Sequence, residues 1–266
     1  MTERNSPTKQ RLLDEAIRLL DTHGPEALQA RKVTAAACTS TMAVYTHFGG
    51  MRELVDEIAV EGFRLLTDAL ASVEPGEDPV ADLAALALAY RSRALAAPHL
   101  YRLMFGLTAT GGYRLPGTDL TSPSARTDAS DRTGTSARTD ASDRTGASAD
   151  TGASAPTTEP FIGQEAFAHL VEATRRAIEA GRFRDEDPTH TAAQLWSALH
   201  GYVLLEMSGY FGEPDSAVEP ILIPLLSGLV IGLGDTPAHA ETSAAGFRTA
   251  SGQPEQPVAR HPRHGS

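Results

Sequence analysis

The chain has 266 residues, of which 41% are hydrophobic, and this length and composition allow one or two domains with a packed core. Its formal net charge of −11 argues against a non-specific coat on nucleic acid, although specific binding needs only a few well-placed cations. The single cysteine, Cys38, excludes an internal disulfide and a zinc site built on several thiolates, which suits a reducing compartment.

Signals for export or membrane insertion are not evident. The N-terminal segment MTERNSPTKQRLL is polar and charged, without the apolar stretch of a signal peptide. The longest strongly apolar run, at about 221–233, contains Pro224 and two glycines and is too short to cross a bilayer. We therefore expect a cytoplasmic protein with no membrane partner.

Apolar residues recur at helical spacing through most of the chain, and no stretch shows sustained period-two alternation. In the first such segment, Gly24 and Pro25 follow the last apolar position and predict the end of a helix. Asp78 precedes Pro79 and predicts a capped helix start. The pattern predicts an all-α fold of about nine helices, at about 11–23, 30–37, 40–48, 51–73, 79–97, 98–106, 163–181, 188–209 and 220–233.

The composition changes sharply between about 116 and 160. The segment SARTDASDRTGT (124–135) is followed directly by SARTDASDRTGA (136–147), which differs at one position, and then by a decayed third copy. No large apolar residue occurs from 121 to 160, so this insert has nothing to contribute to a core and is predicted to be disordered. The tail at 235–266, rich in Ala, Pro, His and Gly, is also predicted to be disordered. These breaks suggest two domains, at 1–66 and 67–234.

Residues 30–48 have the pattern of a helix-turn-helix, with a short first helix, a turn near Cys38 and a second helix capped by Ser40 or Thr41. In this arrangement Val33, Ala37 and Val44 point inward and fix the crossing of the two helices. Helical spacing then leaves several small, polar and aromatic side chains available to solvent or DNA: Ser40, Thr41, Met42, Ala43, Tyr45, Thr46 and His47.

The stretch from about 9 to 63 resembles the DNA-binding domain of the TetR family of bacterial transcriptional regulators. The resemblance rests on a first helix ending in HG, on Arg31 ahead of a valine, on AVYTHF and on the following GGMRELVDEI. It implies phosphate contacts from Tyr45 and His47 and a further contact from Arg31. It also implies that bases are read by the first positions of the second helix, Thr41, Met42 and Ala43.

Three positions depart from the family pattern. Cys38 stands where the family usually has a turn glycine, Thr39 where it has an apolar residue, and Met51 where it commonly has lysine. A looser turn and a missing phosphate contact would weaken DNA binding. Taken singly, the site residues also have ordinary explanations, since Tyr45 fits half-buried core and His47 fits a helix C-terminus. Thr41 could be only a cap, and Arg31 only a surface cation.

The segments PHLYRLMFG and LWSALHGYVLLEMSGYF resemble the regulatory domain of a TetR subgroup marked by a Trp and a His-Gly pair, here Trp196, His200, Gly201 and Glu206. The resemblance implies a homodimer built by the last two helices and a ligand pocket between the helices at 79–97, 98–105, 163–180 and 188–209. Gly201 would let another helix approach closely. Each pocket candidate could also be plain core: Tyr90, Leu103, Met104, Phe105, Phe167, Leu170, Trp196, Leu199 and His200.

These observations predict a helix-turn-helix DNA-binding domain followed by a helical-bundle regulatory domain. The expected function is a homodimeric repressor on a pseudo-palindromic double-stranded DNA operator, released by a small, uncharged or weakly polar organic ligand. The alternative is an all-α protein-interaction module that has lost specific DNA binding. We expect no enzymatic activity, cofactor or metal site, because the sequence has no GxSxG, Walker A or HExxH motif and no metal-ligand spacing.

Overall fold

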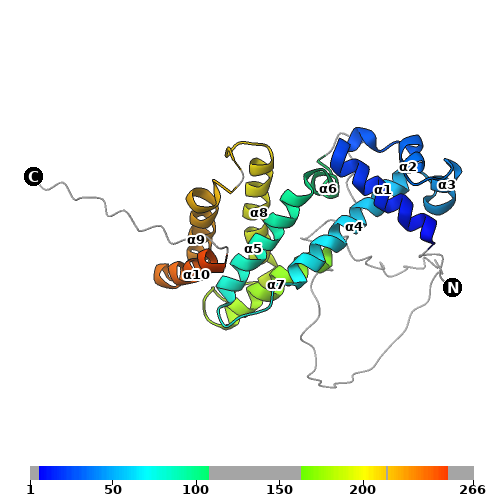
Figure 1. Cartoon of the computed structure of the whole chain (residues 1–266). Helices are drawn as coiled ribbons and strands as arrows, with labels where there is room; N and C mark the ends of the chain where they lie inside the picture. Colours follow the sequence, from blue (N-terminus) through cyan, green and yellow to red (C-terminus); the bar gives the residue numbers. More distant parts are fainter. Residues whose placement is uncertain (1–5, 108–162, 214, 251–266) are drawn as a thin grey trace, which may run out of the picture.

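A computed structural model of the chain describes residues 6–107, 163–213 and 215–250. The predicted insert at 116–160 lies outside these ranges. The described residues form α-helices with short 3-10 and π turns and contain no strand, which confirms the all-α prediction (Figure 1). The α-helices are α1 (Pro7–His23), α2 (Ala30–Ala36), α3 (Met42–Phe48), α4 (Met51–Ala71), α5 (Pro79–Ala96), α6 (Pro98–Met104), α7 (Gln164–Glu179), α8 (Pro188–Met207), α9 (Ile223–Gly232) and α10 (Pro237–Ala250).

Helices α1, α2 and α3 pack together with the first half of α4 at one end of the molecule (Figure 1). Their apolar stripes meet in a core that fully buries Leu12, Leu20, Leu54 and Ile58. α1 ends where predicted, because Gly24 takes a φ of 77° and its N–H donates to the Leu20 carbonyl. This geometry turns the chain toward the 3-10 turn Pro25–Ala27 that precedes α2.

The long helix α4 joins this end to the second group of helices, α5 to α10 (Figure 1). Asp78 caps α5 as expected, accepting from the N–H groups of Val80 and Ala81. Asp187 caps α8 in the same way. α6 packs on both α1 and α4, so it touches each part of the fold. Gly62 of α4 allows this approach, because a Cβ there would lie 2.6 Å from the Met104 sulfur.

The predicted disorder of the 235–266 tail is wrong for residues 235–250, because α10 occupies 237–250 and packs on α5 and α9. The helix is held by Asp235, whose side chain is 1% exposed and accepts two hydrogen bonds from Arg182. The alanines of this segment, which contributed to the prediction of disorder, belong to a helix that packs against its neighbours. Residues 251–266 lie outside the described part of the chain.

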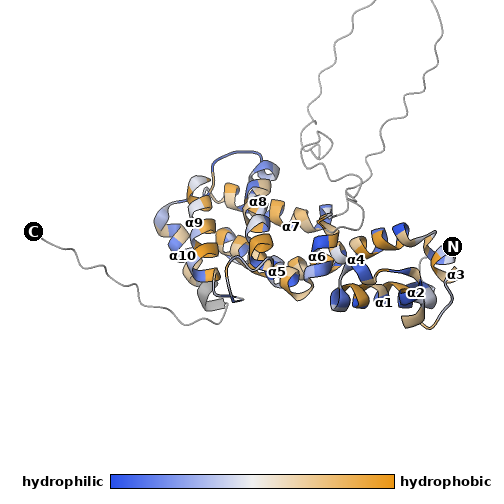
Figure 2. Ribbon diagram, turned by 90° about the horizontal axis from the view of Figure 1, so that it is seen from above, coloured by the Kyte–Doolittle hydropathy of each residue, from blue (hydrophilic) through white to orange (hydrophobic). Residues whose placement is uncertain are grey.

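Helices α8 and α9 and the turn before α9 contain many hydrophobic residues (Figure 2), and some of their side chains are exposed. Leu205, Ile221, Leu225 and Ile231 are all more than a third exposed. A Cβ added at Gly201 would meet nothing within 4 Å, so the close helix approach expected at this glycine does not occur within the described residues. The described helices include none that is both long and apolar enough to cross a membrane.

Candidate functional site

The α2–turn–α3 unit has the inward positions that the sequence predicts. Val33, Ala37 and Val44 are buried against α1 and α4 and fix how α3 lies on the rest of the unit. On the opposite side of α3, Met42 is 66% and Tyr45 is 56% exposed. The core alternative for Tyr45 is therefore wrong.

Ala43 is not available to DNA as the sequence suggested, because it is only 9% exposed and belongs to the core. Successive helical residues are about 100° apart, so a wide buried arc takes in both Ala43 and the neighbouring Val44. Thr41 stands at the N-cap position of α3, one of the two predicted, but its side chain makes no capping hydrogen bond.

The remaining candidates are exposed or half-buried. Ser40, Thr41 and Thr46 are exposed, His47 is half-buried, and Arg31 is exposed on α2. The Thr46 hydroxyl donates its proton to the Met42 carbonyl within α3, so only its acceptor capacity is unused there. Phe48 and Met51 pack against the core instead, so at these positions the chain uses apolar contact. The exposed and half-buried side chains of the α2–turn–α3 unit therefore include hydroxyl, phenol, imidazole and guanidinium donors.

The turn between α2 and α3 is built around Cys38, whose φ is 52°. The N–H of the next residue, Thr39, donates to the Thr34 carbonyl at 2.9 Å and closes the turn. The left-handed region is where glycine is usually found. Cys38 thus reproduces the conformation of the missing glycine, and the turn is tight despite the departure from the family pattern.

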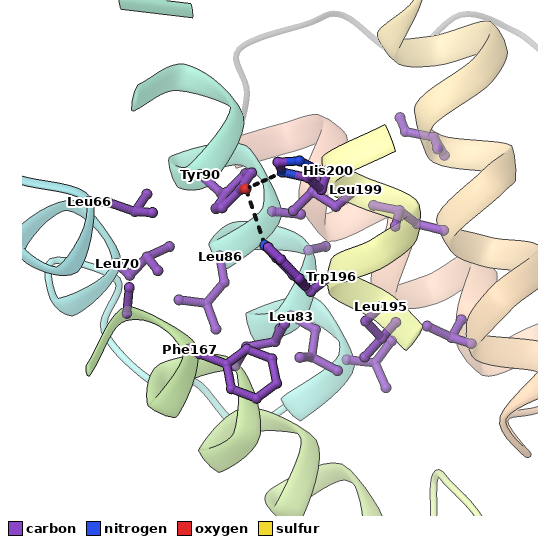
Figure 3. Close-up of a pocket in the computed structure, with 18 of the residues that line it drawn as sticks. Leu66, Leu70, Leu83, Leu86, Tyr90, Phe167, Leu195, Trp196, Leu199 and His200 are labelled. Carbon is purple, nitrogen blue, oxygen red and sulfur yellow. Dashed lines mark hydrogen bonds between the residues drawn. The ribbon is translucent and has the colours of Figure 1, made fainter. Parts of the chain in front are cut away.

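A cavity of about 420 Å³ lies in the second group of helices, lined by α4, α5, α7, α8, α9, α10 and the end of α6 (Figure 3). Of the candidates, Leu103 is buried but does not line the cavity, because it lies on another side of α6. The other candidates do line it: Tyr90, Met104, Phe105, Phe167, Leu170, Trp196, Leu199 and His200.

Three walls of this cavity were not predicted from the sequence. α4 supplies Phe63, Leu66 and Leu70, while α9 and α10 supply residues including Val230 and Ala240. The α4 residues follow a helical spacing that signals burial, but the pattern does not say whether the buried face meets a core or a cavity. The α10 wall was missed because that segment was predicted to be disordered.

One part of the cavity wall carries a polar cluster. The Trp196 Nε1–H donates to the Tyr90 hydroxyl at 3.2 Å, and His200 Nδ1 lies 3.0 Å from the same hydroxyl (Figure 3). Tyr101, on α6, extends the cluster, with its hydroxyl 2.6 Å from Tyr90 and 2.6 Å from His200 Nδ1. Tyr101 was not among the predicted pocket residues, although it lies within the PHLYRLMFG segment that carried the resemblance.

Burial sets the protonation of this cluster. It lowers the pKa of His200 to about 4, so the imidazole is neutral at pH 7. It also raises the pKa of Tyr90 and of Tyr101, so both phenols keep their protons. The four side chains are therefore uncharged and act through N–H and O–H groups alone.

A buried ion pair fastens α8 to α5 close to the cluster. Arg91 donates to both carboxylate oxygens of Glu206, at 2.7 and 2.5 Å, and also to Asp215 at 2.7 Å. The Arg91 and Glu206 side chains are 7% and 6% exposed. Glu206 belongs to the residues that carried the subgroup resemblance, but its partner is 115 positions away and has no signal in the sequence.

An exposed helix-turn-helix joined to a helical domain with an apolar cavity defines a class of protein, the transcription regulators that combine a DNA-reading helix and a ligand cavity in one chain. Two family models match this chain. The model described as "Bacterial regulatory proteins, tetR family" matches residues 12–58, and that described as "Tetracyclin repressor-like, C-terminal domain" matches residues 145–227. Among proteins with curated descriptions, none matches.

Several solved structures have the same fold. A protein of unknown function from Rhodococcus sp. RHA1 is 24% identical, with 88% of this chain and all of that chain covered and a TM-score of 0.59. RolR in complex with resorcinol is 16% identical, with 90% and 93% covered and a TM-score of 0.53. The fatty acid degradation regulator FadR from Bacillus halodurans is 15% identical, with 88% and 100% covered and a TM-score of 0.54. The chain belongs to the TetR family and has the fold of its transcription regulators.

Proposed function

We propose that this regulator is a homodimeric repressor that reads a pseudo-palindromic operator with α3 and leaves it when a small neutral molecule fills the cavity. The observation that carries the proposal is the presence in one chain of an outward-facing α3 and a cavity of about 420 Å³. The finer assignment to the Trp/His-Gly subgroup remains a prediction.

The surface of α3 supports DNA contact through both base edges and phosphates. Thr41 and Met42 lie at the exposed start of the helix, where side chains of a helix-turn-helix meet base edges. Tyr45 and His47 lie one turn further on and carry short donors suited to phosphate oxygens. Arg31 adds a charge on the adjacent helix. The hydroxyl, imidazole and guanidinium groups suit phosphate oxygens and base edges, which supports DNA as the partner. The alternative of a protein-interaction module is separated from it by the salt dependence of binding.

Two helices are shared between the cavity and the DNA-binding end, and they supply a route for the ligand signal. α4 lines the cavity with Phe63, Leu66 and Leu70, and the same helix supplies Leu54 and Ile58 to the helix-turn-helix core. α6 contributes Tyr101 to the polar cluster and packs against α1. A ligand that shifts α4 or α6 would move α3 relative to its copy in a dimer and change the half-site separation.

The exposed apolar side chains of α8 and α9 support the dimer. Leu205, Leu225 and Ile231 lie on these helices and Ile221 lies in the π turn just before α9. Gly201, Gly228 and Gly232 leave space above the helix backbone. Exposed apolar surface of this kind is typical of a protein interface. A two-fold dimer is the symmetry that a pseudo-palindromic operator requires, with two recognition helices about one turn of DNA apart.

The proposal is tested by selecting bound DNA from a random library with the purified protein at two salt concentrations. We expect an enriched inverted repeat whose affinity falls steeply as salt rises, because phosphate contacts release counterions. A folded dimer that enriches no sequence would overturn the DNA-binding role and leave the interaction-module alternative.

Variants then separate the two kinds of contact. Arg31→Ala, Tyr45→Phe and His47→Ala should each weaken specific and non-specific binding together, whereas Thr41→Ala or Met42→Ala should change the preferred sequence. Arg175→Ala is the matched control for Arg31, because that exposed arginine lies on α7 and pairs with Glu172 and Glu179. Equal losses for Arg31→Ala and Arg175→Ala would contradict the assigned surface.

A further inference from the structure

The polar cluster in the cavity wall has more donor protons than internal bonds. At pH 7 its four side chains carry four such protons, one each on the Trp196 indole, the two phenols and the neutral His200 ring. The Trp196 indole can only donate, and its N–H donates to the Tyr90 hydroxyl. A second hydrogen bond joins the Tyr90 and Tyr101 hydroxyls and uses the proton of one of them. His200 Nδ1 has either one lone pair that accepts or one proton that it donates. It therefore forms a single hydrogen bond, with one of the two tyrosine hydroxyls. Three bonds use three protons, and one donor is left over.

The left-over proton belongs on His200 Nε2. Imidazole is a stronger base than a phenol oxygen, so Nδ1 accepts the proton of the nearer hydroxyl, that of Tyr101 at 2.6 Å. With Nδ1 used as the acceptor, the neutral ring carries its own hydrogen on Nε2. Nε2 has no hydrogen-bond partner among the described residues, and His200 lines the cavity.

The rest of the wall excludes a charged ligand. Among its described residues it contains no Asp, Glu, Lys or Arg, and its other hydroxyls are Ser227 and Ser243. Ser243 is occupied, since it donates to Asp78 at 2.5 Å and accepts from Arg182 at 3.0 Å. A charge placed in this space would lose hydration without gaining a counter-charge from the wall.

The wall also divides into two regions. The ring centroid of Phe105 lies 4.6 Å from that of His200 and 6.0 Å from that of Trp196. The ring centroid of Phe167 lies 6.3 Å from that of Trp196. Aromatic rings therefore surround the polar cluster. The surface away from it is mainly aliphatic, with Leu66, Leu70, Val80, Leu83, Ile223 and Val230. This division suits a ligand with a flat or unsaturated polar end and an alkyl body.

We propose that the effector is a neutral molecule with a carbonyl or comparable hydrogen-bond acceptor at one end of an apolar body, and that His200 donates its Nε2 proton to this acceptor. Tyr101 does not line the cavity and acts as a positioning residue that holds the His200 tautomer. The inference rests on the proposed ligand binding and deepens it, because an acceptor on the ligand supplies the bond that the unpaired donor lacks.

The test uses three probes that share a phenyl ring and a five-carbon side chain: valerophenone, pentylbenzene and 5-phenylpentanoate. Each competes with the neutral dye N-phenyl-1-naphthylamine for the full-length protein. The measured quantity is the ratio of the pentylbenzene and valerophenone dissociation constants, compared between proteins so that their different water solubilities cancel. We expect this ratio to fall about tenfold in His200→Phe, the worth of one hydrogen bond, and 5-phenylpentanoate to bind weakest.

His200→Gln provides the matched control, because its amide keeps an N–H donor at similar volume, and we expect it to retain most of the ratio. Tyr101→Phe should reduce the ratio by less and shift the tautomer. Nitrogen-15 NMR of the histidine rings should show Nδ1 unprotonated in the wild type and a mixture of tautomers in Tyr101→Phe. The His200 signals are identified by their loss in His200→Gln.

The outcomes separate the inference from the proposed function. If the probes bind but His200→Phe leaves the ratio unchanged, or if Nδ1 carries the proton, the donor assignment is wrong while ligand binding stands. If neither the dye nor any probe binds the folded protein, ligand binding in this cavity fails and the inference fails with it. Binding that favours 5-phenylpentanoate would overturn the assignment to neutral ligands.

Discussion

At the scale of single residues, the turn of the DNA-binding unit depends on one backbone angle. Cys38 has a φ of 52° and an exposed side chain, so no packing offsets the left-handed conformation. For an L-residue that conformation costs about 1–2 kcal/mol. Glycine takes it freely but loses about 0.5–1 kcal/mol more conformational entropy on folding.

Cys38→Gly should therefore raise the free energy of unfolding by about 0.5–1 kcal/mol, measured by urea denaturation. Cys38→Ala is the control, because alanine has the same difficulty with a positive φ, and it should stay within about 0.5 kcal/mol of the wild type. A Gly variant less stable than the Ala variant would show that the left-handed turn is not a source of strain.

His200 makes stability depend on pH. Burial lowers the pKa of its ring to about 4, whereas the unfolded chain titrates near the ordinary value of 6.5. Between these values the unfolded state binds a proton that the native state does not, so the free energy of unfolding falls as pH drops through this window. The contribution is complete above pH 6.5.

We expect this effect to be about 1–2 kcal/mol between pH 7 and pH 4, after allowing for the partial exposure of the ring. Urea denaturation across this range should show a smaller pH dependence for His200→Gln than for the wild type. Identical pH profiles would mean that His200 is not buried as described, and the NMR titration of the same ring gives an independent value.

At the scale of elements, α10 is both a wall of the cavity and a helix fastened by polar contacts. Arg182 bonds to Asp78 at 2.7 Å and to both carboxylate oxygens of Asp235, and Ser243 of α10 joins the same group. Because Ala240, Ser243 and Ala244 line the cavity, the contacts that hold α10 also hold one side of the ligand site.

Asp235→Asn should therefore weaken two properties together. Losing the carboxylate leaves Arg182 without its buried partner, and we expect the free energy of unfolding to fall by about 2–3 kcal/mol. This loss lies at the lower end of the effect of breaking a buried ion pair, because Arg182 still pairs with Asp78. Faster hydrogen exchange over 237–245 and weaker N-phenyl-1-naphthylamine binding should accompany it.

Glu241→Gln is the control, because it removes a carboxylate from an exposed position of the same helix. It should leave stability, exchange and dye binding close to those of the wild type. If Asp235→Asn lowered stability but left exchange over 237–245 unchanged, the ion pair would not be what holds α10.

At the scale of the whole molecule, the proposed function requires a homodimer with a fixed separation between two copies of α3. Leu225→Glu should convert the dimer to a monomer in light scattering, because it places a charge in the apolar surface proposed as the interface. Operator affinity should fall at least about 100-fold with the loss of one half-site contact.

Val60→Glu is the control, because Val60 on α4 is 42% exposed and Leu225 is 40% exposed. The control variant should stay dimeric. Dissociation caused by Val60→Glu, or a Leu225→Glu protein that remains a dimer, would move the interface away from α8 and α9.

The sequence alone determined most of the helices and the class of protein, because both depend on local information. Helix positions follow from the spacing of apolar residues and from local signals such as Gly24, Pro98 and the Asp78 cap. The order of residues from Arg31 to His47 specifies the helix-turn-helix. Most of the cavity candidates were also found, since the resemblance pointed to particular residues of α6 and α8.

Only the tertiary structure decided which helix faces are covered and what closes the cavity. Ala43 is buried and Leu103 lies outside the cavity because the facing helices come from elsewhere in the chain. α10 is ordered through an ion pair with Arg182, and Glu206 is held by Arg91. Periodicity describes one helix at a time, whereas these contacts join residues 53 and 115 positions apart, so they exist only once the chain has folded.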